Sequence, residues 1–279
     1  MFRRRLVTAV LPVLALALAV MLGGCGKELK EPVFVKNMIC SCDMDAEIEF
    51  ITGDDYGLKV KEVTIPDMPK GISVDFYDEQ VEKFSKYNLH TVNFGISADN
   101  LRDDGSLKKD FVFHKVTIKW EDGNETRSDI GTIHITSNGN DSKLEFGGSS
   151  CTDNSNGDKK YYNEEKYSAT EAVAITGISM PREYGKEIAE RVYDIRANDR
   201  PIQGITKDKP IKLAKGEEVV ISYYIDESVE TKYGKTTLEG VISGIDSDGR
   251  KFTDLFDVRD GNVDMPEWIE RQIANSDSK

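Results

Sequence analysis

Short runs of β-branched and aromatic residues recur along most of the chain, and turn signals separate them. The runs span residues 47–52, 58–65, 111–120, 132–136, 218–225 and 237–245. Asx-Gly pairs, which tolerate positive φ and favour tight turns, punctuate the chain at Asp104-Gly105, Asp122-Gly123, Asn138-Gly139, Asn156-Gly157, Asp248-Gly249 and Asp260-Gly261. Many short strands at this spacing predict a mainly-β chain built from sandwiches or barrels.

The hairpin around Asp122-Gly123 shows the alternation in detail. With these two residues as the turn, one face carries apolar side chains together with one histidine, and the other carries polar side chains. The inner set is Val112, His114, Val116, Ile118, Trp120, Ile133 and Ile135, and the outer set is Lys115, Thr117, Lys119, Thr132, His134 and Thr136. One apolar and one polar face predict a half-buried antiparallel sheet.

A polar stretch rich in Gly, Ser and Asn divides the chain. Residues 138–160 bury too little apolar area to order themselves, so we expect a flexible linker there. The predicted fold is all-β, with two immunoglobulin-like β-sandwich domains in tandem over residues 33–137 and 161–263. Residues 63–69 and 175–181 share a pattern, so the domains are either a diverged repeat or unrelated β-domains with similar turns.

Helical patterns are few. Residues 78–87 predict one short helix capped by Asp78, and residues 181–196 fit either a helix or a strand. Residues 264–279 predict a C-terminal helix and tail with an acidic cap and an early proline. We expect this helix to pack on the second domain; a docking helix for a partner is the alternative.

The first thirty residues have the order of an export signal. Three arginines at positions 3 to 5 precede an apolar run over residues 6–22. The run ends in Leu22-Gly23-Gly24-Cys25, which resembles the lipobox of bacterial lipoproteins. This resemblance implies a signal peptide over residues 1–24 and a mature chain that begins at Cys25, whose thiol carries a diacylglycerol with fatty acyl chains such as palmitate. The alternative is an uncleaved membrane helix, for which 17 residues interrupted by Pro12 are short.

This anchor determines the expected location. Two acyl chains hold a protein stably on a membrane, at about 0.8 kcal/mol for each buried CH₂. Residues 25–32 then form a lipid-anchored tether with a reach of at most about 25 Å. We therefore expect the protein at the extracytoplasmic face of the cell membrane.

The charge of the chain excludes one class of partner. The 279 residues include 37 Lys and Arg against 50 Asp and Glu, a net charge of −13, and removal of the three leader arginines lowers it to −16. An acidic chain without a basic stripe does not bind phosphate backbones, so we predict no nucleic-acid partner. Anionic membrane faces would also repel it, so the lipid on Cys25 is the expected membrane contact.

Three cysteines remain once Cys25 is lipidated. Cys40 and Cys42 point the same way on a strand, so either could reach Cys151. We predict one disulfide between Cys151 and one of this pair, which leaves one free thiol. The alternative is a redox centre at Cys40-Ser41-Cys42, although no thioredoxin-like βαβ pattern surrounds it.

No spacing of residues in the sequence indicates catalysis or a metal. Zinc-ligand spacings do not occur, and possible calcium loops around Gly157 and Gly249 have unsuitable residues at their ends. Glu164 and Glu165 are adjacent, so they do not form a glycosidase pair, and no nucleophile elbow, phosphate loop or Ser/His/Asp grouping occurs. We therefore predict no catalytic residue, no metal and no cofactor.

Together these patterns favour a bacterial lipoprotein that acts as a non-enzymatic binding or assembly module of the cell envelope. Its partner would be an envelope protein or glycan that the sequence does not name. One alternative is a hydrolase of envelope polymers, or an accessory subunit of one, which needs a cleft with a perturbed acid–base pair. The other is the substrate-binding lipoprotein of a transporter, which needs alternating βα patterns that this sequence lacks.

Overall fold

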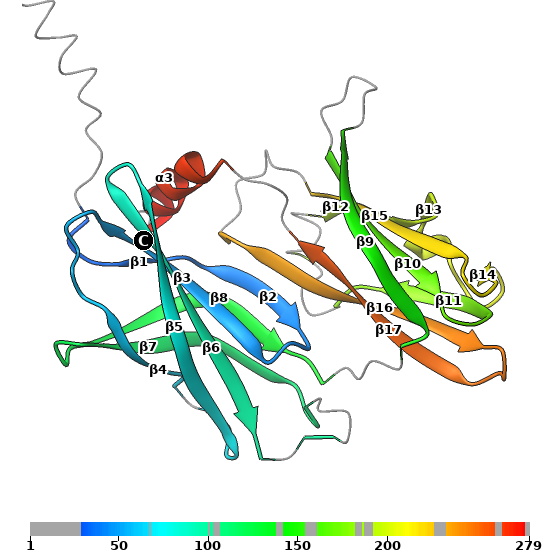
Figure 1. Cartoon of the computed structure of the whole chain (residues 1–279), viewed down its shortest axis with the longest axis horizontal. Helices are drawn as coiled ribbons and strands as arrows, with labels where there is room; N and C mark the ends of the chain where they lie inside the picture. Colours follow the sequence, from blue (N-terminus) through cyan, green and yellow to red (C-terminus); the bar gives the residue numbers. More distant parts are fainter. Residues whose placement is uncertain are drawn as a thin grey trace, which may run out of the picture. The chain divides into compact units, whose positions relative to one another are not determined.

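The computed structural model shows a chain built almost entirely of β-strands, which confirms the predicted fold class (Figure 1). The chain divides into two units, Met1–Glu31 and Pro32–Lys279. The structure describes residues 29–66, 68–99, 101–102, 107–137, 142–153, 161–181, 186, 192–225, 233–259 and 264–276.

The N-terminal half of the second unit forms a β-sandwich. One layer is a four-stranded antiparallel sheet in the order β1-β3-β6-β5, and the other is the β2-β8-β7-β4 portion of an eight-stranded sheet. The strands are β1 (Val33–Phe34), β2 (Asn37–Ser41), β3 (Asp45–Gly53), β4 (Val60–Thr64), β5 (Ile72–Phe84), β6 (Tyr87–Ala98), β7 (Phe111–Trp120) and β8 (Glu125–Ile135). Large side chains from both layers fill the core between them, among them Phe50, Phe94, Ile118, Trp120 and Ile133.

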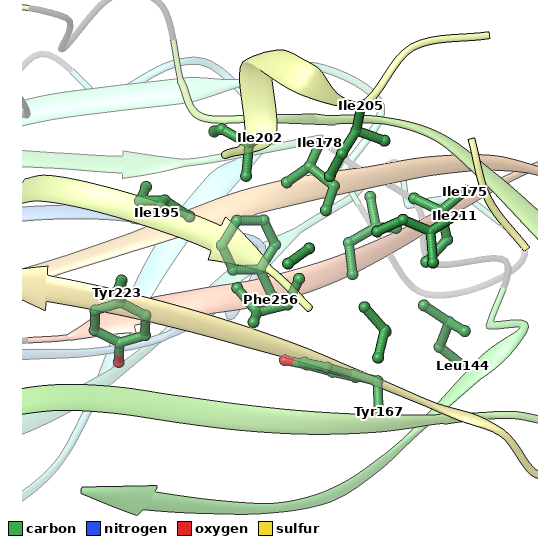
Figure 2. Close-up of a cluster of buried hydrophobic side chains, with 14 of the residues drawn as sticks. Leu144, Tyr167, Ile175, Ile178, Ile195, Ile202, Ile205, Ile211, Tyr223 and Phe256 are labelled. Atoms are coloured by element: carbon green, nitrogen blue, oxygen red, sulfur yellow. The ribbon is translucent and has the colours of Figure 1, made fainter. Parts of the chain in front are cut away.

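The C-terminal half forms a second sandwich on the same eight-stranded sheet. Its first layer is a five-stranded sheet in the order β13-β12-β15-β10-β9, and its second layer is β14-β11-β16 with β17 beside β16. The elements are β9 (Leu144–Asp153), β10 (Tyr161–Ala169), β11 (Val173–Ser179), β12 (Val192–Ala197), β13 (Arg200–Pro201), the 3-10 helix η2 (Ile202–Gly204), β14 (Ile211–Leu213), β15 (Glu218–Ile225), β16 (Thr236–Asp246) and β17 (Lys251–Arg259). Isoleucines from both layers pack around Phe256 in its core (Figure 2).

Strand β2 connects the two sandwiches. It runs parallel to β8 on one side and to β16 on the other. Because successive side chains of a strand point to opposite faces, Ile39 packs in the N-terminal core while Met38 and Cys40 pack in the C-terminal core. Both cores therefore depend on this short strand, and the two sandwiches share one sheet.

The flexible linker predicted over residues 138–160 is wrong for its middle part. That part forms β9, which pairs with β10 along its length. The backbone N–H groups of Lys143 and Leu144 each donate to the buried Asp254 carboxylate at 2.9 Å. Charge-assisted hydrogen bonds thus supply the anchoring that the composition, poor in apolar residues, cannot supply by burial. Outside the described part of the chain lie residues 138–141 and 154–160.

The helix predicted over residues 78–87 is also wrong, because this segment belongs to the β5–β6 hairpin. β5 pairs with β6 from Ile72 to Phe84, and the register shifts next to Asp78. Val81, which would lie on the buried face of the helix, is 53% exposed. The segment is an edge strand with few apolar residues, so its pattern has no period that separates a helix from a strand.

The C-terminal helix is confirmed as α3 (Met265–Ser276). Asp264 caps it by accepting a hydrogen bond from the Glu267 backbone N–H at 3.3 Å. The helix packs against β1 of the N-terminal sandwich, contrary to the expectation that it covers the second domain, and its Trp268 Nε1 donates to Gly234 O at 2.9 Å. The ambiguous segment 181–196 ends in strand β12.

The β7–β8 hairpin is confirmed in outline, but its register differs from the prediction. Lys119 pairs with Glu125 near the turn, and Phe113 pairs with Ile133 beyond an irregularity in the ladder. The extra residues of this irregularity lie on β8 around Gly131, whose φ is +87°. This left-handed conformation favours glycine and permits the local bend.

The irregularity changes which side chains point inward. Phe111 and Phe113 enter the N-terminal core, whereas Val112 and His114, predicted inside, are exposed. His134 lies on the predicted outer face, yet only 5% of it is exposed. The reason is that the C-terminal core continues over this face next to Cys40.

Candidate functional site

A large cleft opens between the two layers of the C-terminal sandwich. Its volume is about 1310 Å³, beyond the ~300–1,000 Å³ of typical small-molecule sites. β9 and β10 line one side, β17 lines the other, and the residues at the end of β2 complete the rim. We refer to it as the acidic cleft, whose charged, aromatic and thiol lining consists of Cys42, Asp43, Glu145, Phe146, Glu164, Glu165, Tyr167, Tyr223, Glu239, Asp254, Phe256, Asp257 and Arg259.

The lining of the acidic cleft carries a large excess of negative charge. Seven of its lining residues are Asp or Glu, and Arg259 is the one Lys or Arg among the lining residues that the structure describes. Arg259 is paired with Asp257 of the same strand. Acidic groups gathered in a cavity with walls of low dielectric focus a negative potential, so the cleft favours cationic groups and disfavours anions.

Glu165 lies at the centre of a hydrogen-bonded group in the acidic cleft. It projects from β10, and only 8% of the residue is exposed. Tyr167 Oη donates to Glu165 Oε2 at 2.5 Å, and the Asp257 backbone N–H donates to the same oxygen at 3.4 Å. Burial raises the pKa of the Glu165 carboxyl above its ordinary value. The carboxylate is therefore held in place and incompletely solvated.

Two tyrosines beside Glu165 stay protonated. Burial and the hydrogen bond to Glu165 raise the pKa of Tyr167, and burial raises the pKa of Tyr223 to about 12. The Tyr223 hydroxyl accepts a hydrogen bond from the Arg259 backbone N–H at 3.2 Å. Both rings therefore face the cleft with neutral hydroxyls.

Phe146 gives the cleft an exposed aromatic side. Leu144, two residues earlier on β9, is buried in the C-terminal core, so alternation along the strand points Phe146 toward the same side. Phe146 is nevertheless 57% exposed, and its ring lies 5.6 Å from that of Tyr167 in an edge-on arrangement. An inward-facing ring stays uncovered here because the cleft separates the two layers.

Glu239 fixes the rim of the cleft where the two sandwiches meet. It is 3% exposed and accepts two hydrogen bonds, from the Cys42 backbone N–H at 2.6 Å and from Thr136 Oγ1 at 3.0 Å. Charge-assisted bonds of this kind are about twice as strong as neutral ones. One carboxylate on β16 thus holds the ends of β2 and β8.

Cys40, His134 and Asp110 form a group that the sequence did not reveal. Cys40 Sγ lies 3.9 Å from His134 Nδ1, and His134 Nε2 lies 3.0 Å from Asp110 Oδ2. A thiol, an imidazole and a carboxylate in this order resemble an activated nucleophile. Cys40 is only 1% exposed and belongs to the C-terminal core, so the group has no access for a substrate.

The structure describes some of the other predicted site residues and leaves others outside its described part. Cys25 lies outside the described residues, and so does the side chain of Cys151, whose backbone pairs with Asn163. The lipidation and the disulfide therefore stay predictions. His90 is buried between Thr52 Oγ1 at 2.9 Å and Glu79 Oε1 at 2.7 Å.

The described residues were compared with the requirements of a metal site and of a membrane-spanning helix. Within the described ranges, His, Cys, Asp and Glu form no group of three or more that could hold a metal ion. Across the same ranges, none of the helices combines the length and the apolar character required to span a bilayer.

The Cys42 thiol is expected to react slowly in the folded protein. Burial and the neighbouring Glu239 carboxylate raise its pKa to about 12, against 9.0 for an ordinary thiol. Because the thiolate is the nucleophile, alkylation of Cys42 by iodoacetamide at pH 8 should be about a thousandfold slower than in urea-unfolded protein. Mass spectrometry of the reduced protein measures this rate.

The charge of Glu239 provides a control for the reaction of Cys42. Glu239→Gln removes the negative charge but keeps an oxygen that accepts the Cys42 N–H, so the folded-state rate should rise. Equal rates for the folded and the unfolded wild-type protein would show that neither burial nor Glu239 suppresses the thiolate.

Comparison with known proteins gives distant structural likenesses. The chain matches no protein-family model and no curated protein sequence. A protein of unknown function from Porphyromonas gingivalis W83 matches 82% of this chain and 97% of its own, with 10% identity and a TM-score of 0.23. The collagen adhesin of S. aureus matches 84% and 94%, with 8% identity and a TM-score of 0.21. The C-terminal domain of the Streptococcus agalactiae AgI/II polypeptide BspA matches 82% and 98%, with 7% identity and a TM-score of 0.20.

Proposed function

We propose that this protein is a lipid-anchored binding module on the extracytoplasmic face of a bacterial membrane, and that the acidic cleft is its ligand-binding surface. The observation that carries the proposal is the cleft itself, a cavity of about 1310 Å³ with an acidic lining and an exposed aromatic ring. Concave surfaces that combine aromatic rings with polar groups are the usual sites of ligand binding.

The rigid surroundings of the cleft suit binding. Two packed sheets carry its walls, and buried hydrogen bonds at Asp254 and Glu239 fix its ends. A binding surface held on strands loses little conformational freedom when a ligand arrives, which favours affinity.

The leader supports the proposed location. The Leu22-Gly23-Gly24-Cys25 box would place a diacylglycerol on Cys25, and two acyl chains are sufficient for stable membrane attachment. The tether of residues 25–32 is short, so the sandwiches would stay within about 25 Å of the bilayer. The partner would then be a protein or glycan of the same envelope.

Membrane retention tests this proposal directly. In a bacterial host that processes lipoproteins, the wild-type protein should sediment with membranes. Cys25→Ser should carry no lipid adduct, and its chain should be either soluble or still attached to the uncleaved leader. Intact-mass analysis should show acyl groups on the wild-type chain beginning at Cys25.

A matched control separates the anchor from general damage to the protein. Cys42→Ser changes a thiol at the cleft rim and should leave membrane retention unchanged. If intact-mass analysis showed that the wild-type chain keeps residues 1–24 and carries no acyl groups, an uncleaved helix would replace the lipid anchor and the proposed lipid anchoring would be rejected.

A further inference from the structure

Tyr77 lies across the outer face of the four-stranded sheet in the N-terminal sandwich. β5, β6 and β3 run side by side in this sheet (Figure 1), and Phe94 and Ile96 of β6 pack in the core, so Gly95 between them faces outward. A Cβ atom on Gly95 would overlap the hydroxyl end of the Tyr77 ring. The ring therefore reaches across β6 at this glycine, and its Oη donates to Asp45 Oδ1 on β3 at 3.3 Å. The side chain is held in one position although 60% of Tyr77 is exposed.

A β-bulge directs Tyr77 to this face. The pairing of β5 with β6 shifts between Phe76 and Asp78, so Tyr77 is the extra residue of the ladder. Bulges are frequent next to active sites, where they re-aim a side chain. An aromatic side chain that is both exposed and already fixed offers a large contact area and loses little conformational freedom when a ligand binds.

A pocket of about 370 Å³ lies beside Tyr77, within the ~300–1,000 Å³ of typical small-molecule sites. We refer to it as the tyrosine pocket. Tyr77, Asp45 and Asn93 line it from the four-stranded sheet, and Lys235 and Arg259 line it from the segments that begin β16 and end β17. Arg259 also lines the acidic cleft, so the two cavities are neighbours.

The charges of the tyrosine pocket favour a neutral ligand. Its Lys235 forms an ion pair with Glu47, which also lines the pocket, and its Arg259 forms one with Asp257. The Asp45 carboxylate accepts the Tyr77 hydroxyl. A charged ligand would compete with these pairs, whereas a neutral ligand leaves them in place.

The donors and acceptors of the pocket suit a ligand rich in hydroxyl groups. The Asp45 carboxylate accepts hydrogen bonds, the Lys235 ammonium donates them, and the Asn93 amide does both. A sugar hydroxyl also donates and accepts at once. The C–H bonds of a sugar ring are polarised by the neighbouring oxygens, so they are attracted to the negative face of an aromatic ring such as that of Tyr77.

We infer that the tyrosine pocket binds a neutral sugar of a β-linked glycan, with one C–H face of the sugar on Tyr77 and its hydroxyl groups on Asp45 and Asn93. A β-linked sugar with equatorial substituents presents a broad face of C–H bonds to such a ring. The inference goes beyond the proposed function, because this pocket is a second site beside the acidic cleft. It rests on the proposed function only for the location, which brings envelope glycans within reach.

Titration with a defined oligosaccharide tests the inference. The probe is N,N′,N″-triacetylchitotriose, a neutral β-linked trisaccharide, and its fully deacetylated form is the cationic counterpart. Isothermal titration of the full-length protein, in micelles of a detergent without a sugar headgroup, should show saturable binding of the neutral trisaccharide. Added salt should change this affinity less than twofold, because the contact does not depend on net charge. At high salt the cationic form should bind at least fivefold more weakly.

Single substitutions locate the binding. Tyr77→Ala removes the ring and should weaken the neutral trisaccharide at least tenfold. Gly95→Ala removes no contacting group, but its Cβ would displace the hydroxyl end of Tyr77 and should weaken binding at least fivefold. Phe146→Ala removes a ring of similar exposure from the acidic cleft and should change the affinity less than twofold. Thermal melts confirm that each variant is folded.

Three results would overturn the inference. Equal affinity of wild type and Tyr77→Ala, or a loss in Phe146→Ala in place of Tyr77→Ala, would remove the sugar from the tyrosine pocket. Tighter binding of the cationic form at high salt would make the pocket a site for cations. If the neutral trisaccharide failed to bind while Cys25→Ser still lost its lipid adduct, the sugar site would be wrong and the anchored module would stand.

Discussion

Replacement of Gly131 by alanine is expected to lower the free energy of unfolding by about 3 kcal/mol, the scale of a severe backbone and packing defect. Gly131 has a φ of +87° in β8 and pairs with Asn37 of β2. A Cβ atom there would overlap the carbonyl oxygen of Asn37 and lie 2.7 Å from its backbone nitrogen. Side-chain movement cannot relieve a clash with backbone, so β2 would have to move away from β8.

The matched control is Gly123→Ala in the turn between β7 and β8. Gly123 has the same φ of +87°, and a Cβ atom there meets nothing within 4 Å. In this variant the free energy of unfolding should fall only by the conformational penalty of about 1–2 kcal/mol. Urea unfolding followed by circular dichroism measures both variants, and equal losses would show that the approach of β2 to β8 adds nothing.

The position of β2 makes a second readout available. Because β2 contributes to both cores, Gly131→Ala should weaken the C-terminal sandwich as well as the N-terminal one. Hydrogen exchange at Ile133 and at Leu238, on the strands either side of β2, should therefore rise together. Faster exchange at Ile133 alone would mean that the sandwiches unfold independently.

Local patterns were sufficient to predict the fold class and the most regular elements. The turn at Asp122-Gly123 and the alternation around it predicted the β7–β8 hairpin, and the acidic cap at Asp264 predicted the start of α3. The prediction that His114 points inward was wrong because the ladder irregularity depends on Gly131 and on the approach of β2 to it. β2 lies far from Gly131 in the sequence. No local pattern contains that contact.

The predictions that were wrong concern segments in which long-range hydrogen bonds replace local apolar burial. Composition predicted a linker where β9 lies, because nothing near it in the sequence signals the buried Asp254, about a hundred residues later, that binds its first amides. The 78–87 segment is a strand because β6 pairs with it, although its own residues fit a helix equally well.

The acidic cleft could not be predicted for a related reason. Its parts come from β2, β9, β10, β15, β16 and β17, and their meeting depends on sheet order rather than on spacing. The sequence did present Glu164 and Glu165 as neighbours, but only the structure shows that Glu165 is buried between Tyr167 and the Asp257 backbone. A signal that was available is the large excess of acidic residues over the whole chain.

Asp254→Ala is expected to lower the free energy of unfolding by about 2–4 kcal/mol and to release the start of β9. Asp254 is 2% exposed and accepts the backbone N–H groups of Lys143 and Leu144, both at 2.9 Å. Alanine would leave two donors without a partner, and each unsatisfied buried group costs about 1–3 kcal/mol. Asp254→Asn keeps an accepting oxygen and should cost less, because only the charge assistance is lost.

Asp122→Ala is the control that separates the effect of burial on stability from the effect of losing any side-chain acceptor for a backbone N–H. Asp122 also accepts a backbone N–H, from Asn124 at 2.9 Å, but it lies in an exposed turn where water replaces the lost acceptor, so this variant should lose less than about 1 kcal/mol. Hydrogen exchange of the Lys143 and Leu144 amides should accelerate in Asp254→Ala and stay slow in Asp122→Ala. Unchanged exchange of these two amides in Asp254→Ala would mean that β9 is held by its pairing with β10 alone.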